Sequence, residues 1–168
     1  MDPEISVWMF QLAVAAGLAA WMSVAVLNNL QAFQASTGAI GLTMGMVLLR
    51  EPPFDTLPLR RRAIASPAVH RLALLGVIAL QAASALALLA GTLLIACDPL
   101  RFASASALAC LNLGLGAFVL CWAAMCVAGL WFGAWIRQEG LLLTQLLLGC
   151  WGLLGFAVLN LPSALARA

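Results

Sequence analysis

Few side chains in this sequence could carry out chemistry, and the single histidine is the first to consider. His70 stands beside Arg71, ahead of a long apolar run. One histidine cannot supply two axial haem ligands, and no methionine lies at a spacing that would complete the pair. We interpret His70 as a capping or interfacial side chain. The alternative is one axial ligand to a chlorophyll-type pigment, or a hydrogen bond to a quinone headgroup.

Arginine, asparagine and tryptophan side chains provide the remaining candidates for a binding site. Arginine pairs with anionic headgroups and tryptophan rings flank flat ones, so these residue types favour a lipid or a quinone as ligand. The candidate binding residues, including the histidine, are Arg62, His70, Asn28, Asn29, Trp131 and Trp135.

The five cysteines do not indicate a metal site. Each lies in or at the end of an apolar run, without a C-x-x-C pair or a neighbouring histidine, and such cysteines are usually small buried hydrophobes. No Ser–His–Asp set, carboxylate pair or phosphate-binding glycine loop can be assembled from the other residues. We predict a protein that is not an enzyme and holds no metal and no cofactor, except for a bound lipid or quinone.

Membrane helices must position these side chains. Three runs, Ile5 to Leu49, Leu72 to Cys97 and Phe102 to Ile136, carry no charge in a chain of 168 residues that is 65% hydrophobic. A hydrocarbon core of roughly 30 Å takes about 20 apolar residues as a helix, and a helix satisfies its own backbone amides in lipid. The sequence predicts an all-α membrane protein, with four transmembrane helices in one bundle and a single domain over residues 1–168.

Turn-forming residues set the expected boundaries. We expect spans at about 5–27, 67–96, 104–135 and 141–161, with Asn28-Asn29 ending the first, Asp98-Pro99 the second and Pro162 the fourth. The third uncharged run would be about 50 Å long as one helix, so it should tilt or project into the headgroups. Ser36 to Leu49 is short for a span and rich in glycine, so we expect an interfacial or re-entrant segment there.

Small residues recur at helical spacing and indicate close packing, because van der Waals contact between backbones drives helix association in lipid. The residues expected in these contacts are Ala83, Ala87, Gly91, Gly129, Gly133, Gly149 and Gly152. Four helices cannot turn so many small faces inward, so we expect one such face to contact another protein.

Charge is scarce and lies mostly between the apolar runs. Eight arginines and six acidic residues give a net charge of +2, which leaves no broad basic face for nucleic acid. The polar residues within the spans are neutral, which disfavours a pump or a proton-coupled transporter. We expect membrane lipids and the transmembrane helices of a larger complex as partners, and no nucleic acid.

Four short motifs, spread over nearly the whole chain, resemble those of one family. They are Leu27-Asn28-Asn29-Leu30; Val47-Leu48-Leu49-Arg50-Glu51 with Phe54; Arg62-Ala63-Ile64-x-Ser66-Pro67-x-x-His70; and Gly129-x-Trp131-Phe132-x-x-Trp135. The chain resembles the bacterial predicted small integral membrane proteins called domain of unknown function 2165. The resemblance implies a multi-pass, four-helix protein of the bacterial inner membrane and implies no reaction.

The chain departs from the family pattern where a site would be expected to keep charge. The pattern has acidic residues where this chain has Gln81 and Leu130, and a Trp-Asn-Gly-Gln turn where it has Gln138-Glu139-Gly140.

The arginine count and the family resemblance disagree on how the protein is oriented in the membrane. Six arginines lie in the first and third loops and two on the other side, which by the positive-inside rule puts both termini outside the cytoplasm. Similar proteins have a basic second loop, which implies termini in the cytoplasm. We favour the latter, because Arg62 belongs to a motif and a loop of about 40 residues can translocate despite its charge.

Two hypotheses for function result. The first is a non-catalytic accessory or structural subunit, packed against a larger inner-membrane complex of electron-transport or photosynthetic type. The second is a lipid- or quinone-binding or transport protein, with its site between Asn28-Asn29, the Arg62 to His70 segment and the Trp131 to Trp135 interface. We expect that segment to fold back near Asn28-Asn29, with Arg62 meeting a carboxylate or a lipid phosphate.

Overall fold

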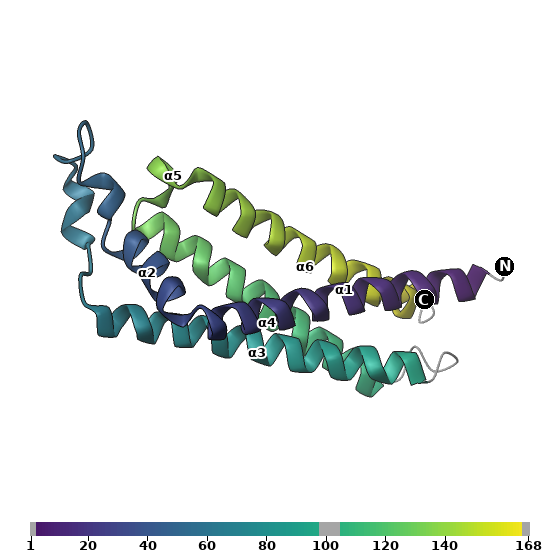
Figure 1. The fold of residues 1–168 in the computed structure, drawn as a ribbon. Helices are drawn as coiled ribbons and strands as arrows, with labels where there is room; N and C mark the ends of the chain where they lie inside the picture. The colour runs from purple at the N-terminus through teal and green to yellow at the C-terminus, as the bar shows by residue number, and fades with distance from the viewer. Residues whose placement is uncertain (1–2, 98–104, 166–168) are drawn as a thin grey trace.

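Four long helices make up the protein in a computed structural model, which describes residues 3–97 and 105–165 and the side chains of 5–97 and 105–160 (Figure 1). They are α1 (Pro3–Gln31), α3 (Pro67–Cys97), α4 (Ala105–Trp131) and α6 (Glu139–Leu165). All four are long and apolar enough to cross a membrane, and the described residues contain no strand. The prediction of an all-α membrane protein with four spans is confirmed.

Four short elements gather at one end of the bundle, called here the loop end: α2 (Phe33–Met44), α5 (Ala134–Arg137) and the 3-10 helices η1 (Val47–Leu49) and η2 (Pro58–Arg62). α1 begins and α6 ends at the opposite end (Figure 1). The expected short segment after the first span is present, as the apolar helix α2 followed by η1.

The long helices do not contact one another equally. α3 packs extensively on both α1 and α4, and α4 packs on α6, whereas α1 and α6 make far fewer contacts. The α1–α6 contacts lie away from the loop end, where Gln11 Nε2 donates to Val158 O (2.9 Å) and the rings of Trp21 and Trp151 meet edge to face. Towards the loop end, α6 therefore has α4 as its main neighbour.

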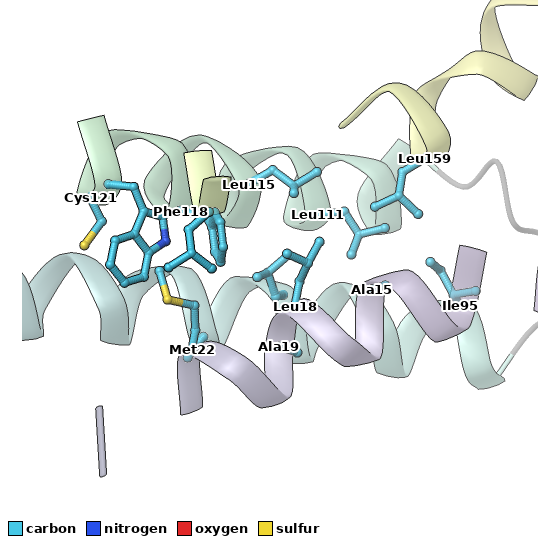
Figure 2. Packing of buried hydrophobic residues seen from close by; sticks show 14 of the residues in the cluster. Ala15, Leu18, Ala19, Met22, Ile95, Leu111, Leu115, Phe118, Cys121 and Leu159 are labelled. Carbon is cyan, nitrogen blue, oxygen red and sulfur yellow. The ribbon is translucent and has the colours of Figure 1, made fainter. Parts of the chain in front are cut away.

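The core fills the space between α1, α3, α4 and α6. Figure 2 shows Leu18 of α1 pointing between the helices toward Leu111 and Leu115 of α4, and all three side chains are fully or almost fully buried. Leu88 of α3 lies over Gly114 of α4, where an added Cβ would stand 2.7 Å from Leu88 Cγ. Close backbone approach at a glycine thus joins α3 to α4, as expected for helices in lipid.

The small residues expected in helix packing lie in different surroundings. Gly91, Gly129 and Gly152 are buried against neighbouring helices, and Ala87 is half-buried. Ala83 is exposed and nothing lies within 4 Å of a Cβ added at Gly149, so these two positions do not lie in a seam between helices of this chain. Residues four apart share a helix face, but their spacing does not say whether that face meets the same chain, another protein or lipid.

The first span ends later than expected, because Asn28 and Asn29 lie inside α1. Ala32 N donates to Asn28 O at 2.9 Å, so the backbone bonding of the helix continues past both residues. The side-chain amide of Asn29 donates to Gln81 of α3. An amide engaged by another helix does not compete for its own backbone, which removes the reason for a turn.

The third span is shorter than the expected range 104–135. α4 ends at Trp131, and Gly133, with φ of +70°, lies between α4 and α5. Glycine adopts this left-handed conformation without steric cost, and the helical backbone of α4 is interrupted here before α5 begins. Gly133 packs against Leu49 of η1 and Met46, so it belongs to this turn rather than to a helix–helix seam. The break divides the long uncharged run between α4 and α5.

The helix α6 continues through Pro162 to Leu165 instead of stopping before the proline, and its candidate membrane span is Glu139–Asn160. Proline has no N–H to offer the carbonyl four residues earlier, which is Val158 O. Gln11 of α1 supplies the missing donor at 2.9 Å. The expected turn at Asp98-Pro99 and the arginines Arg101 and Arg167 lie outside the described residues.

Candidate functional site

A cavity of about 410 Å³ lies between the helices towards the loop end. Its walls come from α1, α2, α3, α4 and α6, through residues that include Ala25, Ile40, Val77, Met125 and Leu141. It forms where α6 no longer contacts α1, so that α2 and α6 face each other across a space. A volume in this range is typical of pockets for small ligands.

The cavity is open at its side. Asn28, Ala39 and Leu141 line it and are themselves exposed. Ala39 belongs to α2 and Leu141 to α6, helices that make few contacts with each other. Thr43 Oγ1 of α2 donates to Oε1 of Gln138, the residue between α5 and α6, at 3.0 Å. The cavity therefore communicates with the surroundings of the bundle between α2 and α6.

Two of the polar lining residues are already paired. Asn29 Nδ2 of α1 donates to Gln81 Oε1 of α3 at 2.9 Å, and only 3% of the Gln81 surface is exposed. This bond closes the cavity wall between the two helices. The pair of neutral amides stands where the family pattern implied an acidic residue, so the wall is held without charge.

Two other polar atoms of the lining have no partner. Gln145 Oε1 of α6 and Trp122 Nε1 of α4 are buried and make no hydrogen bond, and 3% and 8% of these two residues are exposed. Leaving a buried polar group unsatisfied costs about 1–3 kcal/mol. Trp8 Nε1 of α1, whose residue does not line the cavity, is buried and unpaired in the same way.

His70 has a structural position outside this cavity. Its Nε2 lies 2.8 Å from Ile64 O, and because a carbonyl only accepts, Nε2 carries the hydrogen. The ring packs against Gly41 of α2, where an added Cβ would stand 2.9 Å from Nδ1. Ile64 N also donates to Met44 O at 2.8 Å. The histidine thus ties the start of α3 to the loop and to α2.

Arg62 and Trp131 meet at the loop end. The guanidinium carbon of Arg62 lies 4.4 Å from the centre of the Trp131 ring, a cation–π contact. Arg137 stacks similarly on Phe54, at 5.1 Å. The expected pairing of Arg62 with a carboxylate is not what the described residues show. The segment folds back as expected, but against the α4–α5 turn rather than against Asn28-Asn29, because Phe54 and Ile64 pack on the cluster around Phe132.

The six candidate binding residues therefore do not form one site. Asn28 and Asn29 line the cavity, whereas Arg62, His70 and Trp131 hold the loop end together, and Trp135 is exposed on α5.

Gln145 and Trp122, the lining residues with an unpaired buried atom, were not among the predicted site residues. Gln145 is one of the neutral polar residues within the spans. The available signal for Trp122 was its position deep inside α4, because tryptophan in a membrane helix normally favours the interface.

The chemistry of the lining is that of a binding site. Its polar side chains are amides, hydroxyls and an indole, and none of the residues named as lining it is charged. Across the described residues, no group of three His, Cys, Asp or Glu side chains lies close enough to hold a metal ion. The arrangement can hold an apolar body and hydrogen-bond a neutral polar head.

Four apolar spans around a lateral cavity define a multi-pass integral membrane protein. The chain belongs to the family of predicted small integral membrane proteins called domain of unknown function 2165, whose profile matches residues 7–162. The resemblance found in the sequence is thereby confirmed. No curated protein and no solved structure gives a significant match.

Proposed function

We propose that this integral membrane protein binds a lipid or an isoprenoid quinone in the cavity between α1, α2, α3, α4 and α6. The observation that carries the proposal is the cavity of about 410 Å³ itself, which opens at the side of the bundle and has a largely apolar lining with uncharged amide and hydroxyl side chains. The apolar body of a lipid would fill this space, and the uncharged polar side chains would hydrogen-bond its head.

The side opening supports the same proposal. Ala39 and Leu141 are exposed where they line the cavity, and both are apolar, so a molecule could enter from the bilayer without crossing a charged surface. Binding and exchange of this kind require no catalytic group. That the protein is not an enzyme, and that it resides in the bacterial inner membrane, stay predictions.

Mass spectrometry of the protein purified in mild detergent tests the proposal. We expect one lipid class to be retained above the detergent background. Replacing Ala73, which lines the cavity on α3, by Phe should reduce the retained amount to near background, because the added ring occupies the ligand's space. Ala79→Phe is the matched control, since Ala79 is exposed on the same helix and outside the lining.

The proposal fails if the unaltered protein retains no lipid or quinone. It also fails if Ala73→Phe and Ala79→Phe retain the same amount as the unaltered protein, provided that both variants elute as folded protein.

A second candidate is the accessory subunit of a larger membrane complex. A shallow depression on the outer side of α4 supports it, with Ala124 and Ala128 one helical turn apart and Trp131 at its end. Small residues at this spacing allow another helix to approach closely in lipid. A transmembrane helix of the partner is the occupant that this surface suits.

Native electrophoresis of membranes solubilised in mild detergent tests this second candidate. We expect the chain to migrate with a larger assembly, and Ala124→Leu to release it, because a larger side chain separates the two backbones. Recovery of the unaltered chain only as a free monomer would remove the candidate.

A further inference from the structure

The shallow depression on the outer side of α4 reaches from the middle of that helix to the loop end, where α4 stops at Trp131 (Figure 1). Its lining is entirely aliphatic and aromatic and includes Leu120, Ala124 and Val127, all of them exposed. A surface of this kind offers an acyl chain van der Waals contact along the helix and offers a polar group nothing. Any charge that selects a ligand must therefore come from the end of the depression.

Arg62 supplies a positive charge at that end. Its guanidinium carbon lies 4.4 Å from the centre of the Trp131 ring, which is itself part of the lining. Nη1 also donates to Trp131 O at 3.4 Å. Within the described residues Arg62 contacts no carboxylate, and the side chain is exposed. A guanidinium carries several N–H donors, and a ring contact uses none of them as hydrogen bonds, so most of these donors remain available to a ligand.

The loop end as a whole carries more positive than negative charge. Its elements and the first turns of α3 and α6 contain six arginines and three acidic residues: Arg50, Arg60, Arg61, Arg62, Arg71 and Arg137, against Glu51, Asp55 and Glu139. In the described residues, Arg50 and Arg60 donate to backbone carbonyls and Arg137 stacks on Phe54. No ion pair among the described side chains neutralises the excess. An anion is therefore attracted to this end of the bundle.

An apolar groove that ends at an arginine is complementary to a phospholipid. The guanidinium can bind phosphate oxygens through parallel N–H groups, and a tryptophan ring favours the headgroup level of a bilayer. A free phosphate ion would make no use of the depression. A zwitterionic head would bring its ammonium group into an excess of positive charge, whereas the head of an anionic phospholipid would not.

We propose that the outer surface of α4 binds an anionic phospholipid, with its phosphate on the Arg62 guanidinium and an acyl chain in the depression. This site is separate from the cavity, because Arg62 does not line the cavity and Ala124 belongs to the depression alone. The lipid occupies the surface on which the second candidate function places a partner helix, so lipid and helix exclude each other there.

Two phospholipids with the same acyl chains and different heads test the assignment: dioleoylphosphatidylglycerol and dioleoylphosphatidylcholine. Each is titrated onto the delipidated protein in mild detergent, and native mass spectrometry counts the bound molecules. We expect the anionic lipid to bind at least about fivefold more tightly, because one basic side chain near an anionic headgroup contributes about that much. Equal binding of the two lipids, or tighter binding of phosphatidylcholine, would overturn the assignment.

Arg62→Gln connects the preference to the site, because it removes the charge and keeps a polar side chain. The preference for phosphatidylglycerol should disappear in this variant. Arg61→Gln is the matched control, since Arg61 is exposed beside Arg62 on η2 and makes no ring contact within the described residues, and it should keep most of the preference. Equal loss in both variants would show that the whole loop end attracts the lipid, and the Arg62 site would fail.

Ala124→Leu examines the apolar part of the site and needs no change at the arginine. The larger side chain fills the depression and should weaken the binding of both lipids severalfold. Ala109→Leu is its control, because Ala109 is exposed on α4 outside the depression. Unchanged lipid binding in Ala124→Leu would contradict an acyl chain in the depression. Release of a partner protein from native membranes by this variant, without loss of lipid, would assign the surface to a helix instead.

The cavity variant separates this site from the binding function proposed above. Ala73→Phe fills the cavity and should leave the preference for phosphatidylglycerol unchanged. If Ala73→Phe abolishes the preference while Arg62→Gln keeps it, the anionic lipid binds in the cavity, and the outer site fails while the binding function stands.

Discussion

Gly91 of α3 lies directly against Leu111 of α4, so closely that a Cβ added to the glycine would stand 2.6 Å from Leu111 Cγ. One turn earlier on α3, Leu88 lies over Gly114 of α4 in the same way. The two leucines fill the gaps that the two glycines leave, and Ser84 Oγ donates to Gly114 O at 2.8 Å within the same seam. This seam explains why α3 and α4 form the most extensive helix pair.

The seam predicts that Gly91→Ala destabilises the protein, by about 1–3 kcal/mol, because overpacking forces the leucine and the backbone apart. Thermal unfolding in detergent measures the effect. Gly76→Ala on the same helix is the control, as nothing lies within 4 Å of its added Cβ, and it should be neutral or slightly stabilising. Equal effects of the two changes would contradict the assignment of the seam.

The bond between Gln11 and Val158 O predicts that substitutions of Gln11 and of Pro162 have coupled effects on stability. Gln11→Leu should lower stability by about 1 kcal/mol, because Val158 O then has neither a side-chain donor nor the helical N–H that proline lacks. In a Pro162→Ala background the restored N–H can bond the carbonyl, so the same change should cost less. A thermal-unfolding cycle over the four proteins measures this coupling. Additive effects would show that the glutamine and the proline act independently.

Replacing His70 should loosen the loop before α3 and leave the amount of bound lipid unchanged. His70→Ala removes the bond to Ile64 O, so the loop should open more often and trypsin should cut sooner at Arg60, Arg61 or Arg62. Retained lipid should stay unchanged, because His70 does not line the cavity. Val69→Ala, at an exposed neighbour, is the control for the cleavage rate. Loss of lipid in His70→Ala would instead support a ligand role for the histidine.

The paired amides of Asn112 and Asn160 predict that substitutions of the two residues have non-additive effects on stability. Asn112 Nδ2 donates to Asn160 Oδ1 (3.0 Å), and Asn160 Nδ2 donates back to Asn112 Oδ1 (2.8 Å), which joins α4 to α6. Asn112→Leu alone should lower the unfolding midpoint, because Asn160 loses its partner on α4. Replacing both by Leu should cost less than the sum of the single changes, by about 0.5–2 kcal/mol. A strictly additive result would mean that the pair contributes no coupling energy.

Cysteine reactivity should follow burial. Cys121 is fully buried and Cys126 nearly so, whereas Cys97 is exposed at the end of α3. We expect a membrane-impermeant maleimide to label Cys97 from one side of the membrane only, and to leave Cys121 and Cys126 unreacted. Since α1 begins at the same end as Cys97, termini in the cytoplasm predict that labelling occurs from the cytoplasmic face. Rapid labelling of Cys121 would reveal water within the core.

The spans could be predicted from the sequence, because crossing a membrane depends on local properties. A run such as Leu72 to Cys97 is apolar and uncharged whatever its neighbours are, and its backbone must bond to itself in lipid. Ser66-Pro67 likewise marks the start of α3, which begins at Pro67, since proline fits the first turn of a helix.

Only the tertiary structure decided which face of each helix points inward. In a soluble protein, polarity would distinguish the two faces, but here the core-facing Leu88 and the lipid-facing Leu86 are equally apolar. The sequence therefore could not separate the buried Gly91 from the exposed Ala83.

The candidate site depended on pairing across helices for the same reason. Gln81 and Gln145 are the same residue type within spans, yet Gln81 meets Asn29, whereas Gln145 meets an open cavity. That difference arises because α1 stays beside α3 while α6 leaves α1 towards the loop end. The sequence determined that these amides lie in membrane helices, and the packing of the helices decided which of them meets a partner on another helix.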